Sequence, residues 1–493
     1  MARAGKFVFV GCNRAALIRI VMSEPVLLKK IVDGGFCSGC GACAYQTKSK
    51  MKLNAYGEYQ PDLSALEKLS GDDAEAAATA CPFLRPDLNE DVLAEERFGS
   101  DAVHDSHIGY HISRYGGYVK QDDFRASGTS GGMGTWIGSE LLRRGMIDGV
   151  IHAKAVDADQ ADGAFFKYEI SRTEDSIREG AKTRYHVLEM SDVMAEVRER
   201  PGRYLFIGVP CFSKAVRRLQ KTDPVINERI AYVVSLVCGH YKSVNWTRSL
   251  AWGAGVHPRD LAAFQYRTKG PDIPARAYVF RATAKDGHAV QKDSAEVVGG
   301  KFNAGAMMLN ACDYCDDVVG ETSDLTIGDA WLPRFDINRG GTNLLIVRNR
   351  EIEELLQQAK EQDLVSLEVI SAKEAADSQS GGFRQRHEGL SHRLLKAQKE
   401  GRWVPVKRIE PGAIALSGAR RRIYDERVRC ASLSREAFKA ALEQDDYGYY
   451  VSTMGKAFKR LRAIELRSSF FRILKGRIER ILQKLKLKIK GGR

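Results

Sequence analysis

The order of apolar and polar positions predicts an α/β domain in the middle of the chain. Across residues 108–350, short apolar runs alternate with segments of helical periodicity, a pattern typical of a sheet covered by helices. Residues 351–445 have mostly helical periodicity, as in 351–362 and 387–399. We therefore predict an α/β fold with a mixed or parallel-sheet domain over 105–350 and a helical accessory region after it.

The clearest local prediction is a β-α-β unit over residues 203–238. Residues 204–207 and 230–237 are apolar runs suited to buried strands, and 212–220 has helical periodicity. A crossover of this kind makes the two strands parallel, so their carboxyl ends meet at one sheet edge. Cys211 and Cys238 follow these strands. They are either two unrelated core cysteines or part of a site at the edge where α/β folds bind ligands.

A glycine-rich loop precedes the predicted helix 133–144. Its sequence, from Arg125 to Gly132, is RASGTSGG. Small residues at a helix N-terminus leave backbone N–H groups free for an anion, and we expect Thr129 or Ser130 to cap the helix and approach a phosphate. A plain capped turn explains the loop equally simply, because the chain lacks both G-x-G-x-x-G and a P-loop lysine here.

The chain has ten cysteines, and eight of them form two candidate ligand groups, with Cys12 and Cys430 left over. The first group is C-x2-C-x2-C, and Cys81-Pro82 is the nearest candidate for its fourth member. Three closely spaced thiolates favour an iron–sulfur cluster over zinc, and we predict a ferredoxin-like segment over residues 30–100. The second group adds the C-x2-C pair at 312–315 to the two cysteines of the sheet edge, and spacing alone leaves zinc and a cluster equally open there. The expected ligands are Cys37, Cys40, Cys43, Cys81, Cys211, Cys238, Cys312 and Cys315.

The charge of the chain is concentrated at its end. The formal net charge is +13, yet residues 456–493 contain 14 basic and only two acidic residues. The body is nearly neutral and contains nothing that resembles a nucleic-acid module, so we expect no nucleic-acid partner. No run of 18 apolar residues predicts a membrane span, and the cysteine pattern suits the cytoplasm better than a secreted disulfide scaffold.

The basic tail has the apolar spacing of an amphipathic helix, with basic residues on the other face. Such a helix binds an anionic membrane surface, here the inner face, or docks on a protein partner or on its own body. The sequence leaves these alternatives open. At the other end we separate residues 1–29 as an N-terminal extension, with translation starting at Met1 or at Met22.

A set of motifs in this order resembles one known family. The motifs are Cys37-x2-Cys40-x2-Cys43, Thr129-Ser-Gly-Gly132, Lys182-Thr-Arg-Tyr185, Gly208-Val-Pro-Cys211, Cys238-Gly-His240, Cys312-x2-Cys315 and Gly328-Asp-Ala-Trp331. The family is that of the coenzyme F420 hydrogenase/dehydrogenase beta subunits, which includes 7-hydroxymethyl chlorophyll a reductase. The resemblance covers roughly residues 30–350.

The resemblance implies an iron–sulfur flavoprotein oxidoreductase with FAD and two 4Fe–4S clusters, which takes electrons from ferredoxin or another electron-transfer protein. Its flavin would pass a hydride to or from an organic substrate that the sequence does not identify. The residues implied near FAD are Thr129, Ser130, Gly131, Gly132, Lys182, Tyr185 and Asp329, and the eight cysteines would be the cluster ligands.

Two departures and two alternatives accompany this reading. The family's nearby fourth cysteine is missing from the first group, and Arg184 stands where a smaller residue or lysine is expected.

His240, Tyr185 and His186 are candidate proton donors, but each is equally explained as a turn or packing residue. A non-catalytic electron-relay subunit and a zinc-bound, membrane-tethered interaction protein are the alternative functions.

Overall fold

The computed structural model describes residues 23–157, 163–269, 273, 277–336, 338 and 340–490. An eight-stranded sheet forms its centre, in the order β15-β5-β14-β13-β9-β8-β6-β7. Strands β13, β9, β8 and β6 are mutually parallel, and β14, β15 and β7 run antiparallel to their neighbours. The predicted α/β class is confirmed. The strands are β5 (Ser113–Val119), β6 (Gly149–Ala155), β7 (Phe166–Ser171), β8 (Tyr204–Gly208), β9 (Ile230–Leu236), β13 (Leu325–Asp329), β14 (Asn343–Val347) and β15 (Val365–Val369).

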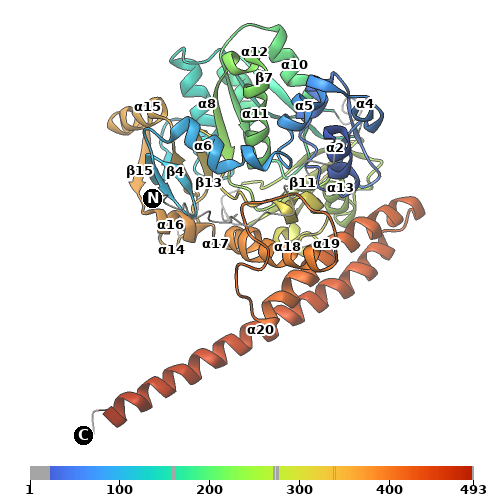
Figure 1. Cartoon of the computed structure of the whole chain (residues 1–493), viewed down its shortest axis with the longest axis vertical. Coiled ribbons are helices and arrows are strands. Elements are labelled where there is room, and N and C mark those ends of the chain that lie inside the picture. Colours follow the sequence, from blue (N-terminus) through green and yellow to red (C-terminus); the bar gives the residue numbers. More distant parts are fainter. Residues whose placement is uncertain are drawn as a thin grey trace, which may run out of the picture.

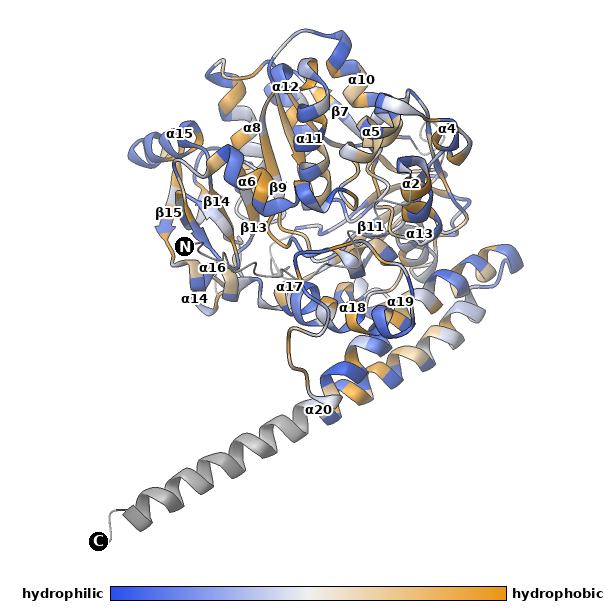
Figure 2. Ribbon diagram, viewed as in Figure 1, coloured by the Kyte–Doolittle hydropathy of each residue, from blue (hydrophilic) through white to orange (hydrophobic). Residues whose placement is uncertain are grey.

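Helices cover both faces of this sheet (Figure 1). The apolar strands lie between them (Figure 2), as expected of parallel strands buried on both sides. Along β8, Leu205 packs with one core and Phe206 with the other, because successive side chains point to opposite faces. One face is covered by α8 (Met133–Arg143) and α15 (Arg350–Glu361), and the other by α10 (Ser191–Glu199), α11 (Pro210–Thr222) and α12 (Pro224–Arg229).

The predicted β-α-β unit is present as β8, α11 and β9. The two strands pair in parallel, with Phe206 opposite Val233 and Gly208 opposite Ser235. Their carboxyl ends therefore lie at the same sheet edge, together with the end of β13. Pro210 at the first turn of α11 ends the strand and begins the helix, because proline fits that position without losing a hydrogen bond.

The N-terminal part packs beside α11. It contains a two-stranded hairpin of β1 (Met51–Leu53) and β2 (Tyr59–Pro61) and a small apolar core that includes Leu28, Ile31 and Leu66. The predicted 1–29 extension lies largely outside the described residues. The helices are α2 (Glu24–Asp33), α3 (Ala42–Thr47), α4 (Leu63–Glu67) and α5 (Gly71–Ala80), and α6 (Glu90–Phe98) with the hairpin β3 (Val103–Asp105)–β4 (Gly109–His111) leads to the central sheet.

A second, three-stranded sheet forms beside the main one, where sequence patterning alone had not separated it. Its antiparallel strands are β10 (Leu261–Gln265), β11 (Val279–Ala284) and β12 (Ala289–Asp293). The short helices α7 (Phe124–Ser127), α9 (Glu174–Glu179), α13 (Val244–Gly253) and α14 (Pro333–Asp336) connect the strands.

The chain ends in a helical region. It contains α16 (Ala372–Ser378), α17 (Ser380–Phe383), a π-helical turn at Arg384–Glu388, α18 (Gly389–Lys399), α19 (Gly418–Gln444) and α20 (Tyr447–Lys490). The start of α20 packs along α19 and buries Tyr450, Met454, Ala457 and Leu461 (Figure 1). The apolar stripe predicted for the tail lies beyond residue 468, outside the described side chains. In the part of the chain that is described, no helix is both long and apolar enough to cross a bilayer.

Candidate functional site

The four cysteines of the first group surround one small cavity, here called the first thiol site. Cys37 and Cys40 lie in the loop before α3, Cys43 lies in α3, and Cys81 caps the end of α5. The other walls are apolar or uncharged and include Leu28, Leu66 and Phe83. The Gly39 N–H donates a hydrogen bond to the Cys37 sulfur at 3.3 Å. The structure thus supplies Cys81, from 38 residues further along the chain, as the fourth thiol.

Arg218 of α11 fixes the position of Cys81. Its side chain is completely buried, and its guanidinium donates to the carbonyl oxygens of Thr79, Cys81, Leu84, Arg85 and Leu88. A guanidinium has five N–H donors in a fixed fork, which suits it to hold several carbonyls of one loop. The helix that carries Cys211 near its start therefore also holds the loop of Cys81.

The other four cysteines surround a second small cavity, the second thiol site. Cys211 begins α11 and Cys238 follows β9, while Cys312 lies in a 3-10 turn at Asn310–Tyr314 that Cys315 ends. The Tyr241 N–H donates to the Cys312 sulfur at 3.2 Å. The expectation that Cys211 and Cys238 emerge at one sheet edge is met, because β8 and β9 are parallel neighbours.

Burial raises the pKa of all eight thiols, which favours their protonated form. Burial raises the pKa of Cys40 to about 12 and that of Cys238 to about 11, and burial followed by neighbouring thiols raises the pKa of Cys211 well above its usual value. A bound metal releases such protons, because only thiolates ligate. Among the described residues, no three or more His, Cys, Asp or Glu side chains converge on one ion position. The donors instead ring a cavity.

The two thiol sites are neighbours, and the second borders a larger space. Ser38 and Phe83 line both thiol cavities. Cys238 and Tyr241 line both the second thiol site and a pocket of about 610 Å³, here called the large pocket. The three cavities therefore lie in a row, each sharing wall residues with the next.

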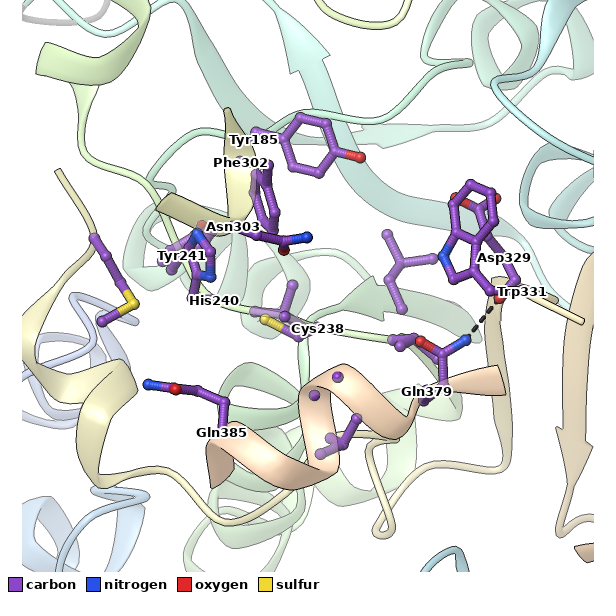
Figure 3. A pocket seen from close by; sticks show the side chains of 18 of the residues that line it. Tyr185, Cys238, His240, Tyr241, Phe302, Asn303, Asp329, Trp331, Gln379 and Gln385 are labelled. Atoms are coloured by element: carbon purple, nitrogen blue, oxygen red, sulfur yellow. Dashed lines mark hydrogen bonds between the residues drawn. The ribbon is translucent and has the colours of Figure 1, made fainter. Parts of the chain in front are cut away.

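The large pocket joins a further cavity of about 230 Å³, the loop pocket, through shared walls that include Arg184, Tyr185 and Asp329. Figure 3 shows Tyr185, Phe302, His240 and Cys238 around the large pocket, with Gln379 and Gln385 contributed by the helical region. The Gln379 side-chain amide donates to the Asp329 carbonyl oxygen at 2.6 Å. The accessory region thus closes the site.

The glycine loop lines the loop pocket, but it does not cap α8 as expected. Thr129, Ser130 and Gly132 are on the wall, whereas Gly131 packs against Gly117 and Asn343 of the sheet and is not. The N-cap is Gly132 in a left-handed conformation. The Ser130 hydroxyl donates a hydrogen bond to the Thr342 carbonyl oxygen, and the Thr129 hydroxyl forms a hydrogen bond with the Thr183 hydroxyl. The first backbone N–H of α8, that of Met133, donates to the Asn343 side-chain oxygen at 3.1 Å, and Gly132, Gly134 and Thr135 at the helix start line the cavity.

Arg184, which appeared in the sequence as a departure from the family pattern, lies on the walls of both pockets. Its guanidinium donates to the Ala181 carbonyl oxygen at 3.0 Å and lies over the Phe166 ring, while its Nε and Nη1 have no hydrogen-bond partner among the described residues. Lys182 lines the loop pocket beside it in a left-handed conformation. Burial lowers the pKa of both side chains. An anion in the loop pocket would relieve this cost.

Asp329, Tyr185 and His240, which the sequence also singled out, each contact different partners. The Asp329 carboxylate forms an ion pair with Arg267 at 2.7 Å. Tyr185 packs among Tyr278, Phe302 and other rings, and burial raises its pKa. His240 stacks on Phe302 with centroids 4.1 Å apart.

Of the three candidate proton donors, His186 is the one that does not line either pocket. It is buried, and its Nδ1 lies 2.7 Å from the Val187 carbonyl oxygen. Sequence reasoning also missed Arg184, Phe302, Gln379, Gln385 and Arg386. The only signal for Arg184 was its place in the Lys182–Tyr185 motif, and the others carry no local pattern.

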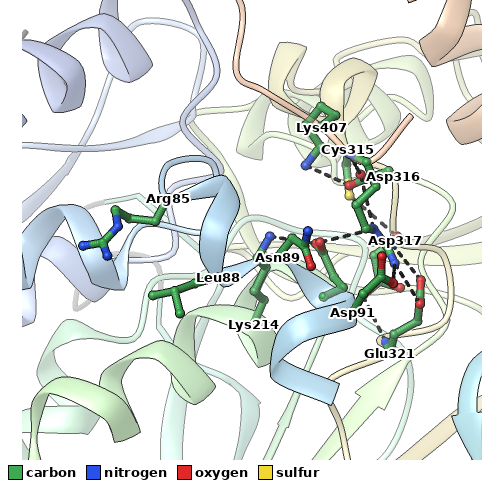
Figure 4. A network of polar contacts seen from close by, with 12 residues as sticks. Arg85, Leu88, Asn89, Asp91, Lys214, Cys315, Asp316, Asp317, Glu321 and Lys407 are labelled. Carbon is green, nitrogen blue, oxygen red and sulfur yellow. Dashed lines mark hydrogen bonds and ion pairs between the residues drawn. The ribbon is translucent and has the colours of Figure 1, made fainter. Parts of the chain in front are cut away.

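A buried network of charges lies beside Cys315 (Figure 4). Lys214 pairs with Glu90 at 3.0 Å, Lys407 with Asp316 at 2.8 Å and Arg408 with Glu321 at 2.8 Å. These pairs join α6, α11, the loop after Cys315 and the segment after α18, and they hold the second thiol site against the N-terminal part.

Two regions of the chain match models of one protein family. Residues 114–195 match the N-terminal region of the coenzyme F420 hydrogenase/dehydrogenase beta subunit, and residues 202–373 match its C-terminal region. A chain of the xenon-derivatized F420-reducing NiFe hydrogenase complex from Methanosarcina barkeri aligns with a TM-score of 0.43 at 19% identity, covering 57% of this chain and 92% of that chain. No curated protein matches significantly. The two family matches together span just over half of the chain, which therefore belongs to the coenzyme F420 hydrogenase/dehydrogenase beta subunit family, a family of oxidoreductase subunits.

Proposed function

We propose that this protein is an iron–sulfur flavoprotein that passes electrons between ferredoxin or a partner subunit and an organic substrate. The observation that carries this proposal is the series of cavities: two four-thiol sites share Ser38 and Phe83, and the second shares Cys238 with the large pocket. Such an arrangement suits a relay of single electrons that ends beside a site for two-electron chemistry.

The chain would hold a 4Fe–4S cluster at each thiol site. Four thiols around a cavity fit a multi-iron cluster. A single zinc ion with Zn–S bonds of about 2.3 Å needs its sulfurs to converge within roughly 4 Å of one another. When bound, the clusters would carry single electrons and a flavin would exchange a hydride.

The loop pocket suits the phosphate-bearing part of FAD. The N-terminal end of the α8 dipole, at Gly132, and the cations Lys182 and Arg184 supply positive potential. Tyr185 and Asp329 lie where the loop pocket meets the large pocket, so they would flank the junction between cofactor and substrate. The Arg267 pair holds the Asp329 carboxylate in place.

The large pocket would take the organic substrate. His240 presents a nitrogen, Nε2, that has no hydrogen-bond partner in the described part of the chain. Burial, then Lys242 and Arg386, lowers the pKa of His240 well below its usual value. A neutral imidazole there would accept a hydrogen bond and orient the substrate.

The protein would work in the cytoplasm, with residues 469–493 available to hold it at an anionic membrane surface. This part of the proposal rests on the basic amphipathic sequence. The start of α20 packs on α19 and buries Ala457 and Leu461, so we assign the proposed membrane role to residues 469–493 rather than to the whole of 456–493.

Anaerobic purification tests the proposal directly. We expect a brown protein with about eight irons and one FAD per chain. A colourless protein with stoichiometric zinc would exclude it. Reduction by ferredoxin followed by an acceptor screen separates an enzyme from a relay subunit, because a relay subunit alone would be reduced without turning over any acceptor.

A further inference from the structure

The two thiol sites differ in the charge placed against their sulfurs. The cavity of the first site is lined by no charged side chain among the described residues. The buried guanidinium of Arg218, which holds the Cys81 loop, donates its hydrogen bonds to five backbone carbonyl oxygens and not to a sulfur. The cavity of the second site has a guanidinium, that of Arg386, in its wall.

Arg386 contacts the second site directly. It comes from the π-helical turn at Arg384–Glu388 and is 2% exposed. Its Nη2 donates to the Cys238 sulfur at 3.4 Å and to the Gly239 carbonyl oxygen at 3.3 Å. Its Nε has no hydrogen-bond partner in the described residues, and among them no carboxylate lies within ion-pair distance of this guanidinium.

The other charges at the second site largely cancel. Lys407 pairs with Asp316, and Asp317 accepts the backbone N–H groups of Val319, Gly320 and Glu321. The Lys242 amine donates to the Ala306 carbonyl oxygen at 2.6 Å and lies over the Trp246 and Phe302 rings. A buried cation without an ion-pair partner is unfavourable, and four thiolates with their metal would supply the missing negative charge.

We propose that Arg386 is the counter-ion of the second thiol site and gives the cluster bound there a higher reduction potential than the cluster at the first site. This inference rests on the proposed function. A fixed positive charge and an N–H···S hydrogen bond both stabilise the reduced, more negative state of a cluster. The first site also has an N–H···S hydrogen bond, from Gly39 to Cys37, but no positive charge in its lining, so the guanidinium is what distinguishes the two sites.

This order of reduction potentials sets the direction of electron transfer between the two sites. One electron leaves the reduced first cluster, which is oxidised, and enters the second cluster, which is reduced; no bond or proton changes. The electron comes from a low-potential one-electron donor protein, for which dithionite substitutes in the experiment. The second site, beside the large pocket, is then the favoured resting place of the electron.

The experiment is an anaerobic redox titration followed by electron paramagnetic resonance. In the unmodified protein we expect two steps, with the higher-potential step missing in Cys312→Ser and the lower one missing in Cys37→Ser. In Arg386→Met the higher step should move to lower potential by at least a tenfold change in its one-electron equilibrium, about 59 mV. The lower step should stay in place.

Two further variants separate charge from structure. Arg386→Lys keeps the charge and should retain most of the potential, and Arg348→Met removes another buried arginine that contacts neither thiol site and should shift neither step. If Arg386→Met does not fold, the order of the two steps in the unmodified protein still decides. Equal potentials, a reversed order or an unshifted upper step would overturn the inference, whereas a protein without iron would overturn the proposed function instead.

Discussion

The two thiol sites hold the same number of cysteines but are assembled differently. The first draws all four from one stretch, residues 37–81, and its walls are apolar. The second collects Cys211, Cys238 and the pair at 312–315 from different elements and adds Arg386 from the helical region. The first is therefore a local binding unit that one buried arginine anchors to the body. The second exists only when the sheet, its edge loops and the accessory helices are all in place.

The largest expected effect is the loss of iron when one cysteine is removed from either thiol site. Cys37→Ser and Cys312→Ser should each lose about half of the iron, because each removes one thiolate from a different four-thiol set. Iron and sulfide assays on anaerobically purified protein measure this. Cys430→Ser is the matched control: Cys430 is buried in α19, lines neither site and should leave iron unchanged. If Cys312→Ser retains all of the iron, the assignment of a cluster to the second thiol site is wrong.

Arg218 provides the next test, because it anchors only the first site. Arg218→Met should lower the free energy of unfolding by about 3 kcal/mol, since several buried carbonyls lose their donor. It should also release iron from the first site while the second keeps its own. Denaturant unfolding and the iron assay read out the two effects.

The control for that variant is Arg348→Met. Arg348 is equally buried and donates to Ile108 and Thr326, neither of which lines a thiol site. It should lose comparable stability without any site-selective loss of iron. A uniform loss of iron in both variants would mean that Arg218 acts through global stability alone.

Acid should weaken the side of the molecule that supports the first site. Burial lowers the pKa of His152 and of His186 to about 4, and Met190, close to His186 in the chain, donates its N–H to the Cys40 carbonyl oxygen. Because the unfolded state binds more protons between pH 4 and 6.5, stability falls as pH falls through this window. The expected slope is up to about 1.4 kcal/mol per pH unit for each histidine.

Unfolding of the apoprotein in denaturant across this pH range measures the slope. His186→Phe should reduce it by up to about 1.4 kcal/mol per pH unit, because one of several buried neutral imidazoles is removed. An unchanged slope would show that other groups dominate the acid response.

Removing the basic tail should have the smallest effect on the two thiol sites. Deleting residues 469–493 removes nine basic residues and should abolish sedimentation with anionic vesicles, at about 1 kcal/mol per residue near the surface. Neutral vesicles are the control, and the iron bound at each site should not change. Equal sedimentation of both forms would exclude a membrane role for this segment.

Local patterns determined much of the fold. The β-α-β unit was predicted nearly to the residue, because apolar β-branched runs and a proline at a helix start leave few alternatives. The three-stranded sheet was missed, since short half-buried strands such as β12 lack a clear alternation. The capping prediction at Thr129 and Ser130 was wrong, because tertiary neighbours took both hydroxyls.

The sequence by itself identified the eight candidate ligands, since cysteine spacing and order can be read without knowledge of distances. It also determined the parallel strand ends that bring Cys211 and Cys238 together. The sequence had offered Cys81 as the fourth member of the first set, and the structure brings it to that cavity. Only the tertiary structure decided that Arg184 lines both pockets and that Arg386 reaches Cys238 from 148 residues away. The physical reason is that a buried charge has no periodicity of its own: its position depends on which carbonyls, rings and sulfurs the folded chain leaves for it.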